Sequence, residues 1–174
     1  TLALTMCLGL ALPARAAEGF SDLEGHYART AVKAWSERGV LEGYPDGTFR
    51  PDGQVTRAEL AVVLDRVMGY QNMAENTYTD MSDKAWYAPS ILHLTAEGIF
   101  QGRKAGQMMP KSAVTRQEAF AALARCLGLE AGQSAPDFTD DADIAPWAVG
   151  YVSAMKEAGY IRGDKKTGAI RPDD

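Results

Sequence analysis

The 174-residue sequence predicts an all-α fold made of tandem helix-loop-helix repeats. Two observations carry this prediction. The motif Thr-Arg-x-Glu occurs at Thr56 and again, 59 residues later, at Thr115. Openings of the form aromatic-Ser/Thr-Asp begin at Phe20, Tyr78 and Phe138, at intervals of 58 and 60 residues. A fixed period of this kind is typical of small units that must pack together to bury a core.

A first helix is predicted near the start of each repeat. Apolar residues at helical spacing, such as Ile91, Leu92 and Thr95, mark one face for burial. Pro89 stands near the start of the same segment, where a missing N–H group is tolerated. A glycine, which readily adopts the left-handed conformation at a helix end, closes each segment. The stripe of the first repeat is Ala28, Ala31, Val32 and Trp35, and the closing glycines are Gly39, Gly98 and Gly159.

A second helix is predicted after each Thr-Arg-x-Glu motif. In a capping box the Thr hydroxyl and the Glu carboxylate bond backbone N–H groups that the first helical turn leaves free. The sequence reaches Asp174 before a third box, so the third repeat is expected to be incomplete. The predicted helices run from Arg57 to about Met68, opened by Thr56 and Glu59, and from Arg116 to about Leu127, opened by Thr115 and Glu118.

The N-terminal end has the character of a partial signal peptide, residues 1–16. An apolar run from Leu2 to Leu12 precedes an Ala-x-Ala site, and the run is too short to span a bilayer. No membrane span is therefore expected. The sequence lacks an initiator Met at one end and the third capping box at the other, so both ends are expected to be truncated. The repeats are assigned to residues 20–70, 78–130 and 138–174.

Composition narrows the partners. The net charge of -5 argues against nucleic acid, because phosphate binding needs a positive field. Cys126 is the one cysteine after the predicted signal, so no internal disulfide can form. Its apolar neighbours favour a small buried side chain with no catalytic role.

Arg57 and Arg116 are the candidate anion-binding residues. Capping accounts for the Thr and Glu of each box, but the helix dipole disfavours a cation in the first turn. Free N–H groups at the helix start would attract an anion to the same place. The residues alone support anion binding and a purely structural role about equally for each Arg, and we expect that Arg57 can be truncated without structural cost.

Metal-dependent and catalytic functions find little support in the residue pattern. Asp46 and Asp52 lie in a glycine-containing loop, which suits calcium, but the spacing of a calcium loop is missing and turn formation is the favoured interpretation. His26 and His93 have no ligand partners at metal spacing. No metal or other cofactor and no catalytic activity are expected.

Three quoted segments carry a family resemblance: Phe-Ser-Asp at 20–22, Gly-Val-Leu-Glu-Gly-Tyr-Pro-Asp-Gly-Thr-Phe-Arg-Pro at 39–51, and Val-Thr-Arg-Ala-Glu at 55–59. Together they resemble the S-layer homology (SLH) domain, three times over residues 20–174. The resemblance implies a pseudo-threefold arrangement of repeats around a helical bundle. It also implies a secreted protein held at the cell surface or S-layer by secondary cell-wall polysaccharide, often pyruvylated.

The resemblance also suggests which residues bind the glycan. In the family the Arg of the motif lines a groove, and Arg57 should matter more than Arg116 because its repeat keeps the Gly43-Tyr44 loop. The second repeat departs from the pattern, with Gly-Arg-Lys-Ala-Gly at 102–106. Aromatics before the first helices are expected to be partly core and partly groove wall. The candidate glycan-binding residues are Arg57, Arg116, Gly43, Tyr44, Tyr27, Trp86 and Trp147.

Three functions are compatible with these patterns. The first is a module that anchors an exported protein to the wall glycan. The second is the targeting module of a wall-associated enzyme whose catalytic domain lies downstream. The third is an S-layer protein that self-assembles through downstream domains.

Overall fold

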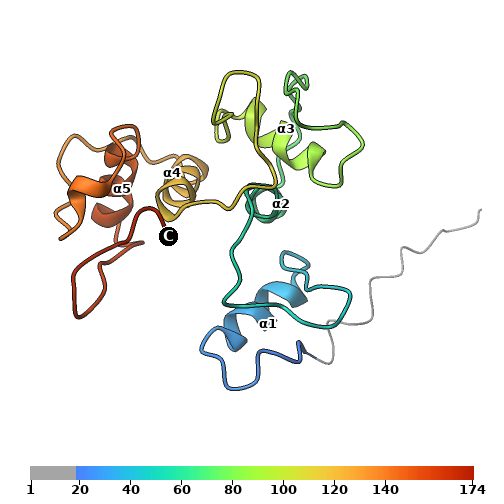
Figure 1. The fold of residues 1–174 in the computed structure, drawn as a ribbon, viewed down its shortest axis with the longest axis horizontal. Helices are drawn as coiled ribbons and strands as arrows, with labels where there is room; N and C mark the ends of the chain where they lie inside the picture. The colour runs from blue at the N-terminus through green and yellow to red at the C-terminus, as the bar shows by residue number, and fades with distance from the viewer. Residues whose placement is uncertain (1–18) are drawn as a thin grey trace, which may run out of the picture. The chain divides into compact units, whose positions relative to one another are not determined.

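The computed structural model describes residues 19–174, so the predicted signal segment lies outside the described residues. The all-α prediction is confirmed, since within this range the regular structure is helical and extended pairing is limited to isolated bridges such as Thr56 with Ala113. The helices are α1 (Arg29–Glu37), α2 (Arg57–Met68), α3 (Ala88–Ala96), α4 (Arg116–Cys126), the 3-10 helix η1 (Asp141–Asp143) and α5 (Val149–Glu157) (Figure 1).

The described residues divide into two compact units, which meet between Gly53 and Gln54. The division falls inside the predicted repeat 20–70. In the second unit α2 packs on α3 and α4 packs on α5, so packing partners are offset by one helix from the sequence repeats. The pseudo-threefold arrangement of all three repeats stays a prediction.

Both Thr-Arg-x-Glu motifs form capping boxes. In α2 the Thr56 hydroxyl accepts the Glu59 N–H at 3.2 Å, and Glu59 accepts the Thr56 N–H at 2.7 Å. Thr115 and Glu118 repeat the arrangement at the start of α4. The predicted start of each second helix is therefore confirmed, and the predicted ends agree to within one residue.

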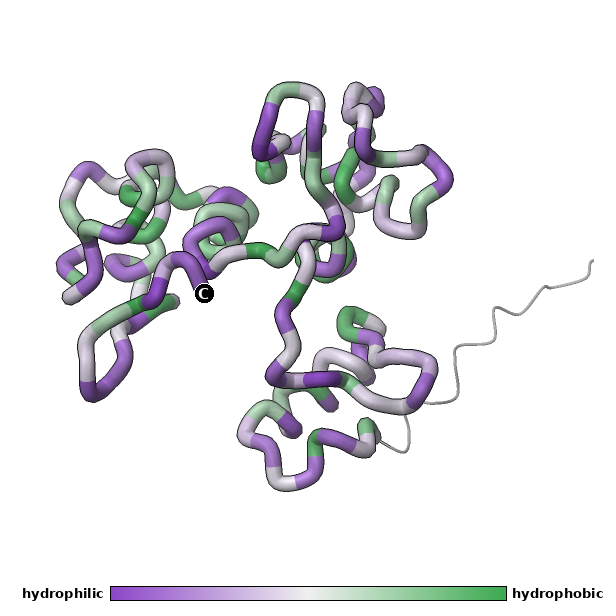
Figure 2. Tube along the Cα trace, in the orientation of Figure 1, coloured by the Kyte–Doolittle hydropathy of each residue, from purple (hydrophilic) through white to green (hydrophobic). Residues whose placement is uncertain are grey.

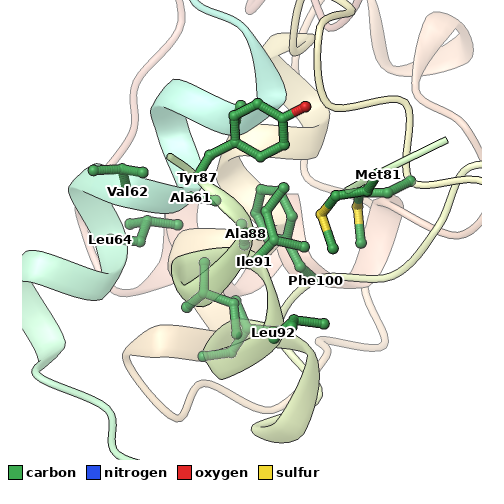
Figure 3. Close-up of a cluster of buried hydrophobic side chains, with 14 residues drawn as sticks. Ala61, Val62, Leu64, Met81, Tyr87, Ala88, Ile91, Leu92 and Phe100 are labelled. Atoms are coloured by element: carbon green, nitrogen blue, oxygen red, sulfur yellow. The ribbon is translucent and has the colours of Figure 1, made fainter. Parts of the chain in front are cut away.

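The core of the second unit lies where α3 packs against α2. Ile91, Leu94 and Met108 are fully buried there. Figure 3 shows Ile91 among the side chains of this cluster, with Ala61 and Leu64 of α2. Removing an aliphatic side chain of this size from water stabilises a fold by roughly 1.5 to 3 kcal/mol. A smaller buried cluster, which includes Val152 and Ile170, packs against α5. The predicted stripe of the α3 segment is thus confirmed, with its apolar members Ile91, Leu92 and Ile99 all buried.

In the first unit the predicted stripe of α1 is only partly buried. Val32 is buried, but Ala31 is exposed and Trp35 keeps 38% of its surface exposed. Leu94, which has the same place in α3, is fully buried. In the second unit α2 packs against α3, and Leu94 belongs to the buried cluster between them.

In each repeat the Asp carboxylate of the opening tripeptide accepts two consecutive N–H groups of the loop, a contact that we call the staple and that the sequence did not reveal. The Asp80 carboxylate accepts the N–H groups of Met108 at 2.9 Å and Met109 at 2.8 Å. Met109 has φ 56°, a left-handed conformation that is unfavourable for a side chain with a Cβ and must be held by its surroundings. The equivalent carboxylates are Asp22, on Phe49 and Arg50, and Asp140, on Ile170 and Arg171. The Asp of each opening tripeptide therefore ties the loop to the start of its own repeat.

The prediction for Cys126 needs a correction. The thiol is only half-buried. Burial raises the pKa of Cys126, and a hydrogen bond involving Tyr70 partly offsets the rise.

Within residues 19–174 no helix is long and apolar enough to cross a membrane, and hydrophilic residues interrupt the hydrophobic ones along the trace (Figure 2).

Candidate functional site

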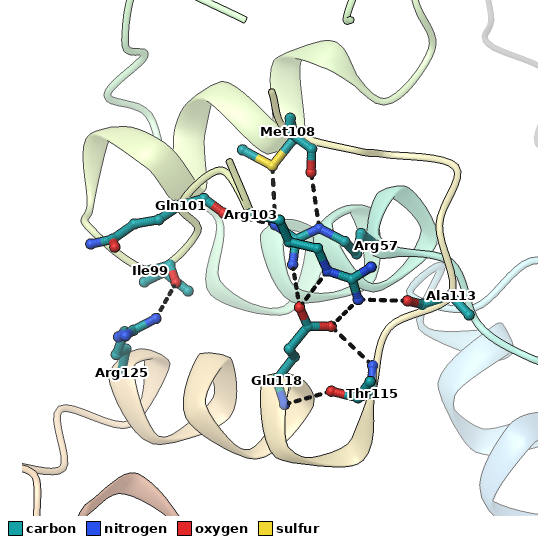
Figure 4. A network of polar contacts seen from close by, with 9 residues as sticks. All are labelled: Arg57, Ile99, Gln101, Arg103, Met108, Ala113, Thr115, Glu118 and Arg125. Carbon is teal, nitrogen blue, oxygen red and sulfur yellow. Dashed lines mark hydrogen bonds and ion pairs between the residues drawn. The ribbon is translucent and has the colours of Figure 1, made fainter. Parts of the chain in front are cut away.

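Arg57 is buried, with only 5% of its surface exposed. Its Nε donates to the Met108 carbonyl at 3.0 Å and its Nη2 to the Gln101 carbonyl at 2.7 Å, while Nη1 pairs with Glu118 at 3.2 Å (Figure 4). Burial lowers the pKa of Arg57 and the charge of Glu118 opposes that change. The expectation that Arg57 can be truncated without structural cost is wrong, because the guanidinium joins three parts of the second unit.

The N–H groups at the start of α2 are also occupied. Arg57 N donates to the Ser112 carbonyl and Ala58 N to the Pro110 carbonyl, both at 2.9 Å. At α4 the Arg116 and Gln117 N–H groups use carbonyls of Asp174 and Pro172 in the same way. The idea that these helix starts offer free N–H groups to an anion is therefore wrong. The loop of the following repeat already satisfies them.

Glu118 connects the capping box of α4 to two arginines. It accepts from Arg57, from Nε of Arg103 at 2.6 Å, from Nη2 of Arg103, and from Thr115 N at 3.0 Å. Burial alone would raise the pKa of Glu118, but the bonds from Arg103 and Thr115 and the charge of Arg57 together lower it. Glu118 is thus an ion-pair hub as well as the capping residue that the motif predicted.

A cavity of about 310 Å³ lies beside this network. Arg57, Arg103 and Arg125 line it together with Glu118 and Trp147, so α2, the 99–103 segment, α4 and the stretch just before α5 all contribute. Arg125 donates from Nη1 to the Ile99 carbonyl at 3.0 Å and lies over the Tyr151 ring. Three guanidinium groups face one carboxylate, so the cavity is locally positive in a chain of net charge -5. Such a site favours an acidic ligand.

The structure brings Arg57 and Trp147 together at this cavity and leaves other predicted residues outside its lining. Trp86 is 66% exposed and Arg116 is exposed, with Nε on the Ile170 carbonyl at 2.7 Å. Gln117, which replaces the Ala of the first motif, is structural, since its side chain bonds Asp173 and the Ala145 N–H.

The remaining predicted residues belong to the first unit. Tyr27 is 92% exposed, and the Tyr44 ring lies 3.9 Å from the guanidinium carbon of Arg50. Gly43 is packed so closely against the Phe20 ring and the Thr48 carbonyl that a Cβ would clash. The Arg57 side chain bonds Met108, Glu118 and Gln101, which all belong to the second repeat, and the expected contribution of the Gly43-Tyr44 loop to its binding stays a prediction. Tyr27 and Trp86 are more exposed than a partly buried role predicts, whereas Trp147 is half-exposed and lines the cavity.

Other candidate chemistry resolves into structural roles. Asp46 accepts the Thr48 N–H at 3.0 Å and pairs with Arg50, which is turn formation as predicted. His93 lies 3.0 Å from Asp65 and links α3 to α2. Across residues 19–174, no three His, Cys, Asp or Glu side chains are grouped to hold a metal ion.

Sequence reasoning missed Arg103 and Arg125. Arg125 stands nine residues after Arg116, as Arg66 stands nine after Arg57, so the repeat comparison could have found it. Arg103 was visible only as a departure from the loop pattern. Its pairing with Glu118 depends on packing between the loop and α4, and no local signal encodes it.

Comparison with known proteins places the repeats in a family. The S-layer homology domain model matches residues 19–61, 77–120 and 137–174. The Surface-layer 125 kDa protein of Lysinibacillus sphaericus is 30% identical over 149 residues, which cover 86% of this chain and 13% of that protein. The Cellulosome-anchoring protein of Acetivibrio thermocellus is 32% identical over 132 residues, 71% of this chain and 29% of that protein. Exoglucanase XynX of the same organism is 27% identical over 151 residues, which cover 83% of this chain and 14% of that protein. The chain therefore spans less than a third of the length of these relatives.

Proposed function

This chain belongs to the S-layer homology domain family, and we propose that it holds an exported protein on the bacterial wall by binding an acidic, pyruvylated secondary wall polysaccharide. Domains of this family anchor surface proteins to the cell wall and are not catalytic, and the protein is secreted and wall-associated. The polysaccharide and its acidic groups are the proposed part.

The observation that carries the proposal is the arginine-lined cavity beside Trp147. A sugar ring presents C–H faces that pack on a flat aromatic surface, and Trp147 is 51% exposed at the cavity. Guanidinium groups bind carboxylates through paired, charge-assisted hydrogen bonds. A ketal-linked pyruvate carries one carboxylate beside a sugar ring, so it matches both features. The proposed glycan contacts outside this cavity are Arg116, Gly43, Tyr44, Tyr27 and Trp86.

Binding to purified cell walls tests the proposal. The protein should co-sediment with walls that retain pyruvate and should bind less after mild acid has removed it. Trp147→Ala should weaken binding about tenfold, which corresponds to about 1.4 kcal/mol of lost apolar packing between the sugar and the indole ring. Met73→Ala is the matched control, because Met73 is 56% exposed and does not line the cavity. Equal binding to native and acid-treated walls would sink the pyruvate assignment.

The role of the whole protein is a second question. Similarity to Exoglucanase XynX favours a targeting module for a wall-associated enzyme, and similarity to the Surface-layer 125 kDa protein favours a lattice protein that assembles through other domains. We favour anchoring as the shared function of both. Full-length protein released from walls should either form sheets or hydrolyse a polysaccharide, and the two outcomes are separable by microscopy and a reducing-sugar assay.

A further inference from the structure

The donors of Arg57 are largely committed within the chain. Nε bonds the Met108 carbonyl, Nη2 bonds the Gln101 carbonyl and lies 3.3 Å from the Met108 sulfur, and Nη1 pairs with Glu118. A guanidinium carries five N–H groups, so at most one is left for a ligand. Paired recognition of a carboxylate needs two. Arg57 therefore suits a positioning role better than direct recognition.

Arg103 has the opposite character. It is fastened to Glu118 through Nε and Nη2, and Nη2 also donates to the Ala113 carbonyl at 2.8 Å. Its Nη1 has no partner among residues 19–174, and the side chain keeps 26% of its surface exposed at the cavity. Three contacts thus fix the plane of the guanidinium while one nitrogen, with two N–H groups, remains for a ligand. A donor held in place before binding loses little entropy when the ligand arrives.

Glu118 cannot neutralise the cavity alone. Its carboxylate already accepts from Arg57, Arg103 and the Thr115 N–H, while Arg125 uses only Nη1, on the Ile99 carbonyl. Two guanidinium charges therefore stay unbalanced at the cavity. A ligand carboxylate that bonds Arg103 and lies near Arg125 would offset one of them.

The position of Arg103 also differs in each repeat. The residue after the loop glycine is Tyr44 in the first repeat, Arg103 in the second and Asp164 in the third. An aromatic ring, a cation and an anion thus occupy equivalent places. A carboxylate would be attracted to the second and repelled by the third.

We propose that Arg103 is the specificity-determining residue for the acidic group of the wall glycan, contacting a carboxylate, and that Arg57 and Glu118 position it. The proposal deepens the wall-anchoring function and rests on it. The departure of the second loop from the family pattern is then the feature that gives this groove its preference.

The test uses the full 174-residue chain and purified wall polysaccharide, native or stripped of ketal-linked pyruvate by mild acid. Arg103→Gln should lose about tenfold to hundredfold in affinity for the native glycan and bind the stripped glycan as the parent does. Arg103→Lys should recover part of the loss, because an ammonium keeps the charge but not the contacts to Glu118 and the Ala113 carbonyl that hold the guanidinium in place. Lys104→Gln is the control, with the same charge change at the next residue, outside the cavity lining, and should stay within about twofold of the parent.

Each outcome decides. Native-glycan affinity that is unchanged in Arg103→Gln overturns the proposal, and so does an equal loss on both glycans, which indicates a structural role. If removing phosphate groups from the glycan, and not removing pyruvate, abolishes the difference in affinity between the parent and Arg103→Gln, the carboxylate assignment is overturned. Failure of the parent chain to bind either glycan overturns the proposed function, and this inference with it.

Discussion

Replacing Arg57 by Ala should destabilise the second unit strongly. The substitution leaves the carbonyls of Gln101 and Met108 without their donor and removes one of the arginines on Glu118. A buried acceptor that loses its partner costs about 1 to 3 kcal/mol, and breaking a buried ion pair costs roughly 3 to 5 kcal/mol. Because Glu118 keeps Arg103 and the Thr115 N–H, we expect a loss of about 3 to 5 kcal/mol in the free energy of unfolding and not the full sum.

Arg116→Ala is the matched control for this measurement. Arg116 has the same place in its motif but is exposed, and its side chain donates to the Ile170 carbonyl and lies over the Phe120 ring. Because the substitution removes only that side-chain bond and the ring contact and keeps the backbone bond, we expect it to cost about 1 kcal/mol. Urea unfolding followed by circular dichroism should give a much lower midpoint for Arg57→Ala at an unchanged slope. A loss from Arg57→Ala no larger than that from Arg116→Ala would refute the reasoning.

Three further measurements follow from other contacts. Asp80→Ala should cost roughly 1.5 to 3 kcal/mol in urea unfolding, because two N–H groups lose a charged acceptor, and an unchanged midpoint would contradict the staple. The lowered pKa of Glu118 stabilises the folded state above the ordinary carboxyl value of 4.5, and this contribution is lost as the pH falls through the lower folded value. Glu118→Gln should therefore flatten the fall of stability in acid, and identical slopes for variant and parent below about pH 4.5 would count against the assignment. Burial raises the pKa of Cys126, so a thiol reagent at pH 8 should label native protein more slowly than urea-unfolded protein; equal rates would contradict the half-buried site.

Different residues stabilise the fold and are proposed to bind the ligand. Stability depends on the carboxylates of the opening tripeptides and on Arg57, which are committed to contacts within the chain. Recognition is proposed for Arg103 and Trp147, which keep exposed surface at the cavity. Substitution of the exposed cavity residues can therefore change the ligand preference, while the internal hydrogen bonds keep the fold stable.

The sequence by itself determined the helical class, the family and the starts of α2 and α4. These features depend on contacts three residues apart, as between Thr56 and Glu59, or on a motif that recurs along the chain. Local hydrogen bonds of this kind form wherever the segment folds, so a linear pattern is enough to predict them.

Only the tertiary structure decided which arginine is buried. Arg57 and Arg116 have the same local motif, yet Arg57 is bonded to Glu118, 61 positions along the chain, and Arg116 stays exposed. Arg103 reaches the same Glu118 from a loop that has no recognisable motif of its own. Such contacts depend on how α2, the second loop and α4 pack, and burial of apolar surface sets that packing without leaving a pattern in neighbouring residues.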